Sequence, residues 1–598
     1  MQDTFDNLYR QSKQGSNFTK LMNIIKSDEN ILLAYRNLSK NNGSYTPGVD
    51  GKTIRNLSKL SNNELIALVH KKLNHYKSSP VKRVYIPKAN GKMRPLGIPN
   101  IIDRLIQQCI LQVMEPIAEA RFYKSNYGFR PLRSAENAIA DCYKKINLQK
   151  LHFVVDCDIK SFFDNVNHNK LIKQLWNIGF RDKQLICIIK EMLRGDIKEP
   201  DGTIIKPMKG TPQGGILSPL LANIVLNELD WWVASQWEEI PTKHQYQGYL
   251  HHNGIRSKNP KYNALRLNSN LKEVYIVRYA DDFKIFCKDY NTAKKMLIAT
   301  KDWIETRLKL QIAPDKSGIT NLRKKYTDFL GFEIKVKRKG ETHVVKSRIR
   351  RKAVKSIRDK LKNHLIIMAK SSGNQRKTMI GQYNSMIMGI HNYYRIATDV
   401  ANDFAIIGRS IKTVLKHRNP YNIQIKSEGD LSTVPEKYRD SKQMRFWGDK
   451  YILPISYIRN SPPMLHKQEA CKYTKEGRSI IPNSYKHNLP KLIRNYIPYR
   501  SAEYNMNRIS KYSAQKGKCI ILKQTLHIDD IHCHHIKPIS QGGEDDYNNL
   551  VIIHKDIHKL IHSSKNETVT SLVNLYKLNR KQIEKINMYR EKVGLEKI

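Results

Sequence analysis

The residues with the clearest chemical potential are two adjacent carboxylates, Asp281 and Asp282. Apolar, β-branched and aromatic runs at 274–277 and 283–286 flank them, which predicts two strands joined by a tight turn. Adjacent carboxylates repel each other unless cations lie between them, and in-line phosphoryl transfer by a nucleotide polymerase uses a pair of divalent metals. The pattern therefore favours nucleotidyl transfer, although an Asp-Asp turn taken alone is usually only solvated.

A second acidic segment ends the apolar stretch 153–159 with Asp158 close to its end. If this strand lies beside the Asp281–Asp282 hairpin in one sheet, the three carboxylates form a site that can hold two divalent ions. One ion would activate the 3′-hydroxyl of a primer, and the other would neutralise the triphosphate. The competing interpretation is an ordinary carboxylate at the end of a strand.

Other residues nearby in the sequence fit a nucleotide site. Lys88 and Arg94 flank a predicted Asn-Gly hairpin, where two cations could clasp a triphosphate. Paired glycines within 209–219 precede an apolar run and would let the backbone lie close to a ligand, such as the incoming base and template. Phe163, five residues beyond Asp158, has a bulky ring without a hydroxyl, so it could exclude a 2′-hydroxyl by overlap. Ordinary core packing is the alternative.

Histidines cluster in the tail as a second, separable constellation. His558 and His562 stand four residues apart, which places both on one face of a helix, where they can share a metal ion with His534. His535 would then be free to deprotonate a water for attack on a phosphodiester, and Asn549 would fix the loop. A purely structural histidine cluster is the competing interpretation.

The composition limits the partners and the compartment. The 598 residues include 105 lysines and arginines against 54 aspartates and glutamates, a formal charge of +51 that is spread along the chain. Such an excess predicts a large polyanion as partner, and nucleic acid fits best. No 18-residue apolar span is present, so no membrane partner is expected. Eight cysteines without C-x-x-C pairs, and an N-terminus without a targeting pattern, favour a reducing, cytoplasmic compartment.

The sequence pattern divides the chain into four regions. Residues 1–335 mix helical and strand patterns and are expected to form one α+β unit. A basic run at 335–362, with 13 lysines and arginines against two acids, marks a boundary, and 336–480 is expected to be helical. The segment 481–515 is basic and rich in tyrosine, as in segments that bind nucleic acid, although a solvated linker fits equally well. The histidine-rich tail occupies 516–598.

These motifs together resemble the reverse transcriptases encoded by group II introns. The matching segments follow the family's order: 86–99, 127–131, 158–164, 210–219, 279–282, 310–316 and 329–332. The resemblance implies a right-hand polymerase fold, with fingers and palm, that copies RNA into DNA from dNTPs. It also implies a set of roles: Asp158, Asp281 and Asp282 as ligands of two Mg²⁺ ions, Lys88 and Arg94 on the triphosphate, Gln213 beside the nucleotide, Phe163 as the gate under the sugar, and Lys316 as the group that protonates pyrophosphate.

The remaining regions resemble further parts of the same family. Residues 383–384 and 389–394 are similar to the signature of its helical thumb, or maturase domain, which implies binding of group II intron RNA and help with splicing. Phosphate contacts of the basic run would make that binding strongly salt-dependent. The tail resembles an HNH endonuclease, a ββα-metal nuclease with one divalent metal that would nick double-stranded target DNA. Together these parts imply target-primed reverse transcription by a ribonucleoprotein that lies on the bacterial nucleoid when DNA is bound.

The tail departs from its relatives at a structural metal site. Related nucleases often carry two C-x-x-C pairs around zinc, whereas here Cys519 is followed by Leu522, and the second pair's positions hold His554 and Ile557. A four-cysteine zinc site therefore cannot form, which questions the stability or activity of this domain. A partial site from Cys519, Cys533 and His554 stays open.

Two other functions compete with this interpretation. A domesticated or defence-associated reverse transcriptase is disfavoured by the HNH tail and the maturase signature. A splicing cofactor that only binds RNA is disfavoured by the presence of all three carboxylates, since a pure binder has no need for them.

Overall fold

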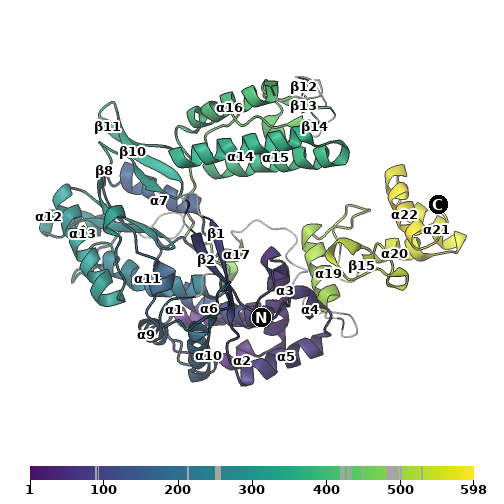
Figure 1. Ribbon diagram of the computed structural model, residues 1–598, viewed down its shortest axis with the longest axis horizontal. Helices are drawn as coiled ribbons and strands as arrows, with labels where there is room; N and C mark the ends of the chain where they lie inside the picture. The colour runs from purple at the N-terminus through teal and green to yellow at the C-terminus, as the bar shows by residue number, and fades with distance from the viewer. Residues whose placement is uncertain are drawn as a thin grey trace. The chain divides into compact units, whose positions relative to one another are not determined.

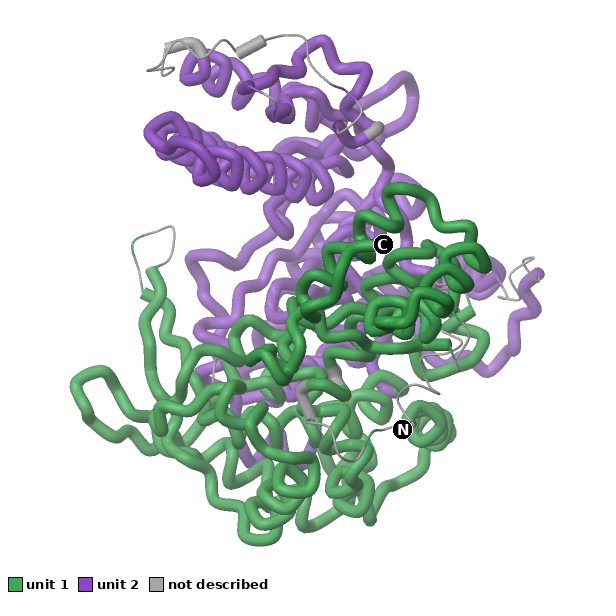
Figure 2. Tube along the Cα trace, turned by 90° about the vertical axis from the view of Figure 1, so that its right-hand side faces the viewer, with its two compact units in different colours: residues 1–120, 175–218, 469–598 green, residues 121–174, 219–468 purple. Residues whose placement is uncertain are grey.

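The computed structural model of the protein contains two compact units (Figure 2). The described residues are 1–87, 91, 93–211, 214–249, 257–417, 425–426, 431, 434–448, 450–479, 497, 502–526 and 530–598. Unit 1 comprises 1–120, 175–218 and 469–598, and unit 2 comprises 121–174 and 219–468. The predicted polymerase region 1–335 thus contributes segments to both units.

Unit 2 contains a four-stranded antiparallel sheet in the order β6-β7-β3-β8. Its strands are β3 (Phe153–Cys157), β6 (Val274–Tyr279), β7 (Asp282–Cys287) and β8 (Gly318–Asn321). Valine, isoleucine and phenylalanine dominate the two strands of the hairpin, and nearly all of their residues are buried. Helices pack against this sheet, α7 on β6 and α13 on β3, β7 and β8. The other helices in this part are α8, α11 and α12; the bounds are α7 (Ala135–Asn147), α8 (Phe162–Asn165), α11 (Ser218–Ser235), α12 (Asn259–Asn268) and α13 (Tyr290–Trp303).

The second half of unit 2 begins with strands where a helical region was expected. Strands β10 (Phe332–Lys339) and β11 (Thr342–Ile349) form a hairpin that β9 (Thr327–Phe329) extends. The prediction of helix for the first part of the basic run is therefore wrong. Basic residues alternate there with apolar ones such as Ile334, Val336 and Val345, and this period of two suits a strand with one buried face.

Three helices follow the hairpin. They are α14 (Arg351–Lys370), α15 (Gly373–Tyr394) and α16 (Val400–His417), and α14 packs against both of the others (Figure 1). In α14, Leu361, Leu365 and Met368 recur at helical spacing and are buried. A small sheet completes this part, with strands β12 (Ile425–Lys426), β13 (Arg445–Trp447) and β14 (Lys450–Ile452).

The first part of unit 1 is a helical layer around α6, whose apolar residues are almost all buried. Its helices are α1 (Gln2–Lys13), α2 (Leu21–Ile25), α3 (Asp28–Ser39), α4 (Ile54–Ser58), α5 (Asn62–Asn74), α6 (Ile101–Glu119), α9 (His168–Ile178, which enters from unit 2), α10 (Lys183–Arg194) and α17 (Lys475–Ser479). Helix α5 begins at a capping box, in which Ser61 and Glu64 each accept a backbone N–H of the other.

The hairpin predicted around the Asn-Gly pair is present in unit 1. Strands β1 (Val81–Pro87) and β2 (Met93–Ile98) pair antiparallel from Lys82 with Ile98 to Pro87 with Met93. Short strands β4 (Ile197–Lys198) and β5 (Ile204–Ile205) extend it to the order β2-β1-β4-β5. Lys88, Ala89, Asn90 and Lys92 lie outside the described residues.

The tail has its own hydrophobic core in unit 1, and two antiparallel strands are followed by a helix. Its elements are α19 (Ala502–Ala514), β15 (Ile531–His535), β16 (Leu550–His554), α20 (Lys555–His562), α21 (Asn566–Leu575) and α22 (Arg580–Lys592). Leu522 and Ile557, which stand where related proteins have zinc cysteines, are both buried in this core together with Cys519. Apolar packing thus replaces a metal at these positions.

Helix α19 belongs to the same core, although its sequence lies in the segment expected to bind nucleic acid. Tyr504 and Tyr512 are 5% and 1% exposed, so neither ring is available to stack on a base. Most of that segment, 481–496 and 498–501, lies outside the described residues.

A buried arginine connects the last helix to α20 and yields a stability prediction. Arg590 is 4% exposed and donates from Nη1 to two carbonyl oxygens, those of Leu560 (2.7 Å) and Ser563 (2.9 Å). Leu560 lies in the last turn of α20 and Ser563 directly follows the helix, where carbonyl groups have no hydrogen-bond donor within the helix itself. Charged hydrogen bonds of this kind contribute about 1.5–3 kcal/mol. We expect Arg590→Ala to accelerate hydrogen exchange of the α20 amides in the full chain. Arg580→Ala removes only the exposed pair with Glu584 on the same helix, so its exchange should match the wild type; equal exchange in both variants would contradict the prediction.

Candidate active sites

The three predicted carboxylates meet at one edge of the β6-β7-β3-β8 sheet. Cys157 pairs with Phe283 across β3 and β7, so Asp158 follows β3 where β7 begins with Asp282. Tyr279 pairs with Asp282 across the hairpin, which leaves a two-residue turn that contains Asp281. The predicted tight turn is therefore present, and Asp282 lies within electrostatic reach of Asp158, 124 positions earlier in the chain.

A buried network behind the turn fixes its shape. Arg278, 0% exposed, is paired with Asp230 at 2.6 Å and also donates to the carbonyl oxygen of Ala280 (2.8 Å) and to Asn223 Oδ1 (3.0 Å). Ala280 has φ +58°, a left-handed conformation that this bond helps to hold. Gly128 packs so closely that a Cβ there would lie 2.2 Å from the Ala280 nitrogen. Sequence reasoning missed these residues; the signal was that Asn223 and Asp230 are polar positions in the largely apolar helix α11.

Burial and the closeness of like charges determine the electrostatics of the carboxylate cluster. Shielding from water raises the pKa of Asp282 to about 6, the Lys284 ammonium lowers it, and the neighbouring carboxylates raise it. Lys316 Nζ lies 2.7 Å from Asp158 Oδ2, and this hydrogen bond raises the pKa of Lys316. Oxygen ligands on crowded carboxylates suit divalent Mg²⁺, which would neutralise the cluster.

Phe163 has the partial exposure that a gate under the sugar requires. It is the second residue of α8, which begins directly after Ser161. The φ of +44° at Ser161 marks a sharp entry of the chain into the helix. The neighbouring ring of Phe162 is 2% exposed and packs edge to face with Phe163 at a centroid distance of 5.4 Å. Phe162 therefore fills the core, whereas part of the Phe163 ring is accessible.

The remaining predicted nucleotide contacts lie in unit 1. Arg94 is exposed on β2, opposite Ile86. Lys88 and Gln213 lie outside the described residues. At Gly214, φ is +110° and a Cβ would lie 2.4 Å from the Gly97 carbonyl oxygen, so glycine is required there for the approach to β2.

Three histidines of the tail form a cluster with metal-binding geometry. Ligand nitrogens of His534 on β15 and of His558 and His562 on α20 all lie within 4.8 Å of one another. Burial and the charges of the neighbouring imidazoles lower the pKa values of His534 and His558 to about 3, so both rings are neutral at ordinary pH. His534 Nε2 is buried and has no hydrogen-bond partner among the described residues. A divalent metal ion fits this donor set.

The predicted general base, His535, is held by two residues that sequence reasoning missed. Its Nε2 lies 2.7 Å from Asp545 Oδ1, and its ring stacks on Tyr504 of α19 at a centroid distance of 5.3 Å and an angle of 16°. A carboxylate on one ring nitrogen leaves the other nitrogen to take a proton from water.

Asn549 makes three hydrogen bonds within the loop between β15 and β16. Its Oδ1 accepts the backbone N–H of Lys537 (2.8 Å), and its Nδ2 donates to the carbonyl oxygens of Lys537 (3.0 Å) and Glu544 (2.8 Å). Gly543 lies within the same loop, where a Cβ would be 2.0 Å from the Lys537 carbonyl oxygen. These bonds close the connection between β15 and β16.

The partial zinc site left open by the sequence has no support in the described part of the tail. Cys519 Sγ accepts backbone N–H groups of Leu522 and His554, each at 3.4 Å. Cys533 is buried, which raises its thiol pKa to about 12. In the described part of the tail, the group whose ligand atoms all lie within 4.8 Å of one another is the three-histidine cluster.

Comparison with known proteins gives two family matches. Residues 86–334 match the family "Reverse transcriptase (RNA-dependent DNA polymerase)", and residues 520–564 match the family "HNH endonuclease". Group II intron-encoded protein LtrA of Lactococcus lactis subsp. cremoris is 31% identical, over 72% of this chain and 81% of that protein. Protein YkfC of Escherichia coli (strain K12) is 34% identical, over 54% of this chain and 86% of that protein. The Arabidopsis thaliana protein "Nuclear intron maturase 2, mitochondrial" is 25% identical over 36% of each chain.

The chain is therefore a reverse transcriptase joined to an HNH endonuclease. It belongs to the family of group II intron-encoded proteins, which join reverse transcription, maturase function and HNH-dependent intron mobility. The resemblance inferred from the sequence motifs is confirmed. No helix in the described part of the chain is long and apolar enough to cross a membrane.

Proposed function

We propose that this chain copies a group II intron RNA into DNA at a site formed by Asp158, Asp281 and Asp282. The observation that carries the proposal is the meeting of these three carboxylates at one edge of a sheet. They would hold two Mg²⁺ ions, which when bound activate the primer 3′-hydroxyl and neutralise the triphosphate. The Arg278 network supports this by keeping the turn rigid, so that the Asp281 carboxylate needs no reorganisation during reaction.

Four further residues are proposed to act on the nucleotide. Lys316 lies at the carboxylate cluster with its proton held by the bond to Asp158, which suits donation to departing pyrophosphate. Arg94, with Lys88, would bind the triphosphate, and Gln213 would lie beside the nucleotide. Residues 1–335 would then be the fingers and palm of a right-hand polymerase.

The sugar gate is tested by Phe163→Val. Removal of the ring opens space for a 2′-hydroxyl, so we expect incorporation of ribonucleotides to rise by at least about tenfold relative to dNTPs, as for a site that loses 1–3 kcal/mol of steric discrimination. Competition between dNTP and rNTP in primer extension measures it. Phe162→Leu, a change at the buried neighbour, should leave this ratio unaltered. An unchanged ratio in Phe163→Val would make Phe163 a packing residue.

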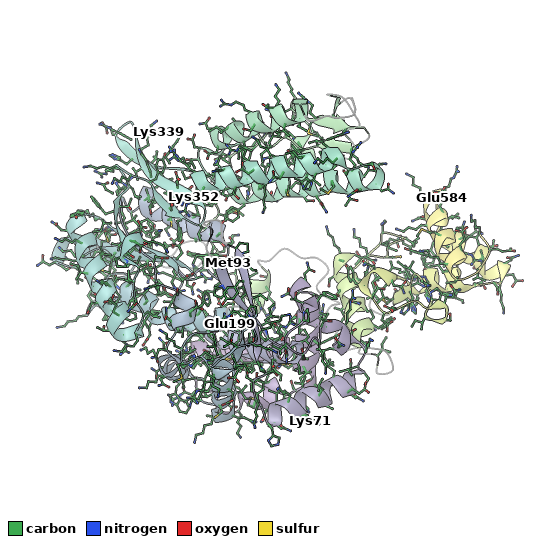
Figure 3. The ribbon with its side chains drawn as sticks, viewed as in Figure 1. Lys71, Met93, Glu199, Lys339, Lys352 and Glu584 are labelled. Carbon is green, nitrogen blue, oxygen red and sulfur yellow. The ribbon has the colours of Figure 1, made fainter. Side chains whose placement is uncertain are left out.

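Intron RNA is the proposed partner of residues 336–480, the thumb or maturase domain. The β10–β11 hairpin and the start of α14 carry exposed lysines, among them Lys339 and Lys352 (Figure 3). Such a surface binds phosphates with an affinity that falls steeply with salt. Sequencing the RNA that copurifies with the chain tests this partner. A self-splicing intron is expected, and random cellular RNA would contradict the proposal.

We further propose that the tail, 516–598, nicks double-stranded target DNA with one divalent metal on His534, His558 and His562. His535, oriented by Asp545, would deprotonate the attacking water. The segment 481–515 would help to bind DNA. The polymerase would then extend the nicked strand with the intron RNA as template, in the cytoplasm and on the nucleoid.

A further inference from the structure

A buried lysine lies directly beneath the polymerase carboxylates. Lys284 stands two residues after Asp282 on β7, so both side chains are on the same face of the sheet. Its Nζ lies 2.7 Å from Asp156 Oδ1 and 3.8 Å from Asp282 Oδ1, and its side chain is 9% exposed. All other residues of β7 after Asp282 are apolar and buried. An ammonium at this depth is costly unless anions surround it.

Lys284 and Asp156 form the cross-strand pair that lies two residues further into the sheet than the proposed metal ligands Asp158 and Asp282. Asp156 pairs directly with Lys284 across β3 and β7. Asp156 is two residues before Asp158, just as Lys284 is two residues after Asp282, so the four side chains share one face. The ion pair is thus continuous with the carboxylate cluster.

Neighbouring residues surround the ion pair. Asp156 also accepts hydroxyl hydrogens from Thr320 (2.9 Å) and Thr327 (2.9 Å), which keeps its carboxylate in place. The centre of the Phe329 ring, a residue that is 1% exposed, lies 5.6 Å from Lys284 Nζ. The ammonium is therefore held near Asp156 and Phe329, with Asp282 Oδ1 at 3.8 Å.

We propose that Lys284 is a positioning residue of the polymerase: its ammonium orients the Asp282 carboxylate from below and supplies a permanent positive charge under the three acids. One Asp282 oxygen faces the ammonium, which leaves the other for a metal. A carboxylate that is already oriented by a neighbouring charge does not have to change its conformation when the metal binds. The inference rests on the proposed role of Asp282 as a metal ligand.

The test must separate this role from simple neutralisation of Asp156. Lys284→Met alone leaves Asp156 buried and unpaired, which destabilises the fold for an unrelated reason. The double variant Asp156→Asn/Lys284→Met removes one charge of each sign, and the asparagine can still accept the two threonine hydroxyls. Net charge under the site is therefore unchanged, and the loss of orientation is what remains to be measured.

Primer extension as a function of Mg²⁺ concentration gives the readout. For the double variant we expect kcat to fall and the half-saturating Mg²⁺ concentration to rise, each by about tenfold. Loss of a residue that holds a metal ligand in place typically costs about 10–100-fold in metal affinity or activity, and this estimate takes the lower value. The KM for dNTP and the thermal unfolding temperature should stay near their wild-type values. Asp156→Asn alone, which retains the ammonium, should lose less activity than the double variant.

A matched control removes another ion pair of the same unit. Arg266 and Glu273 pair at 2.6 Å, and Glu273 precedes β6 at the end of the strand away from the turn. Arg266→Met/Glu273→Gln should keep the wild-type response to Mg²⁺. A double variant at Asp156 and Lys284 with wild-type kcat and wild-type Mg²⁺ dependence would overturn the inference. Failure of the underlying site assignment looks different, because Asp282→Ala would then still extend primers.

Discussion

Replacement of Asp158 or Asp281 by alanine is expected to abolish cDNA synthesis while RNA binding and help with splicing persist. Each substitution removes a proposed metal ligand but leaves the basic β10–β11 hairpin and α14 unchanged. Loss of one preorganised electrostatic element typically costs about 10²–10³ in kcat, and a two-metal site that loses a ligand should lose at least as much.

Primer extension and a splicing assay on the same preparations provide the measurement. Asp302→Ala serves as control, since Asp302 is an exposed carboxylate on α13 in the same unit, and its loss should affect neither assay. Substantial residual extension by both Asp158→Ala and Asp281→Ala would show that these carboxylates do not form the polymerase site. Loss of RNA binding in the same variants would instead indicate a damaged fold.

The second large effect is expected in the nuclease. His535→Ala should eliminate nicking of DNA and leave polymerase activity intact, because the proposed general base contributes about 10²–10⁴-fold and lies in a tail with its own core. Asp281→Ala provides the reciprocal control, with nicking retained and extension lost. Nicking assays with the RNA-bound protein measure both.

The same experiment addresses the missing zinc cysteines. Leu522 and Ile557 are buried with Cys519 in an apolar core, so we expect stoichiometric zinc to be absent from the purified protein. Nicking should then require an added divalent ion. Elemental analysis that finds one tightly held zinc ion per chain would contradict this expectation, and wild-type ribonucleoprotein that never nicks DNA would mean that the nuclease is inactive.

Local sequence patterns were sufficient for the parts of both sites that depend on short-range geometry. The alternation of apolar residues around Asp281 and Asp282 predicted the hairpin, and the spacing of His558 and His562 predicted one helical face. Periods of two and of about four residues are properties of the backbone itself, so they are visible without knowledge of the rest of the chain. The same reasoning failed for the basic run, where charge concealed the strand alternation of β10 and β11.

The sequence by itself therefore determined which residue types are available for two-metal polymerase chemistry and for a histidine metal site, and it excluded a four-cysteine zinc site. Only the tertiary structure decided what holds these residues in place: Arg278 with Asp230, Asp545 against His535, and Lys284 with Asp156. Two of these three pairs join residues 48 and 128 positions apart, and all three depend on how separate segments pack. Local periodicity contains no information about such pairings, because burial and charge compensation are set by the segment that arrives from elsewhere in the chain.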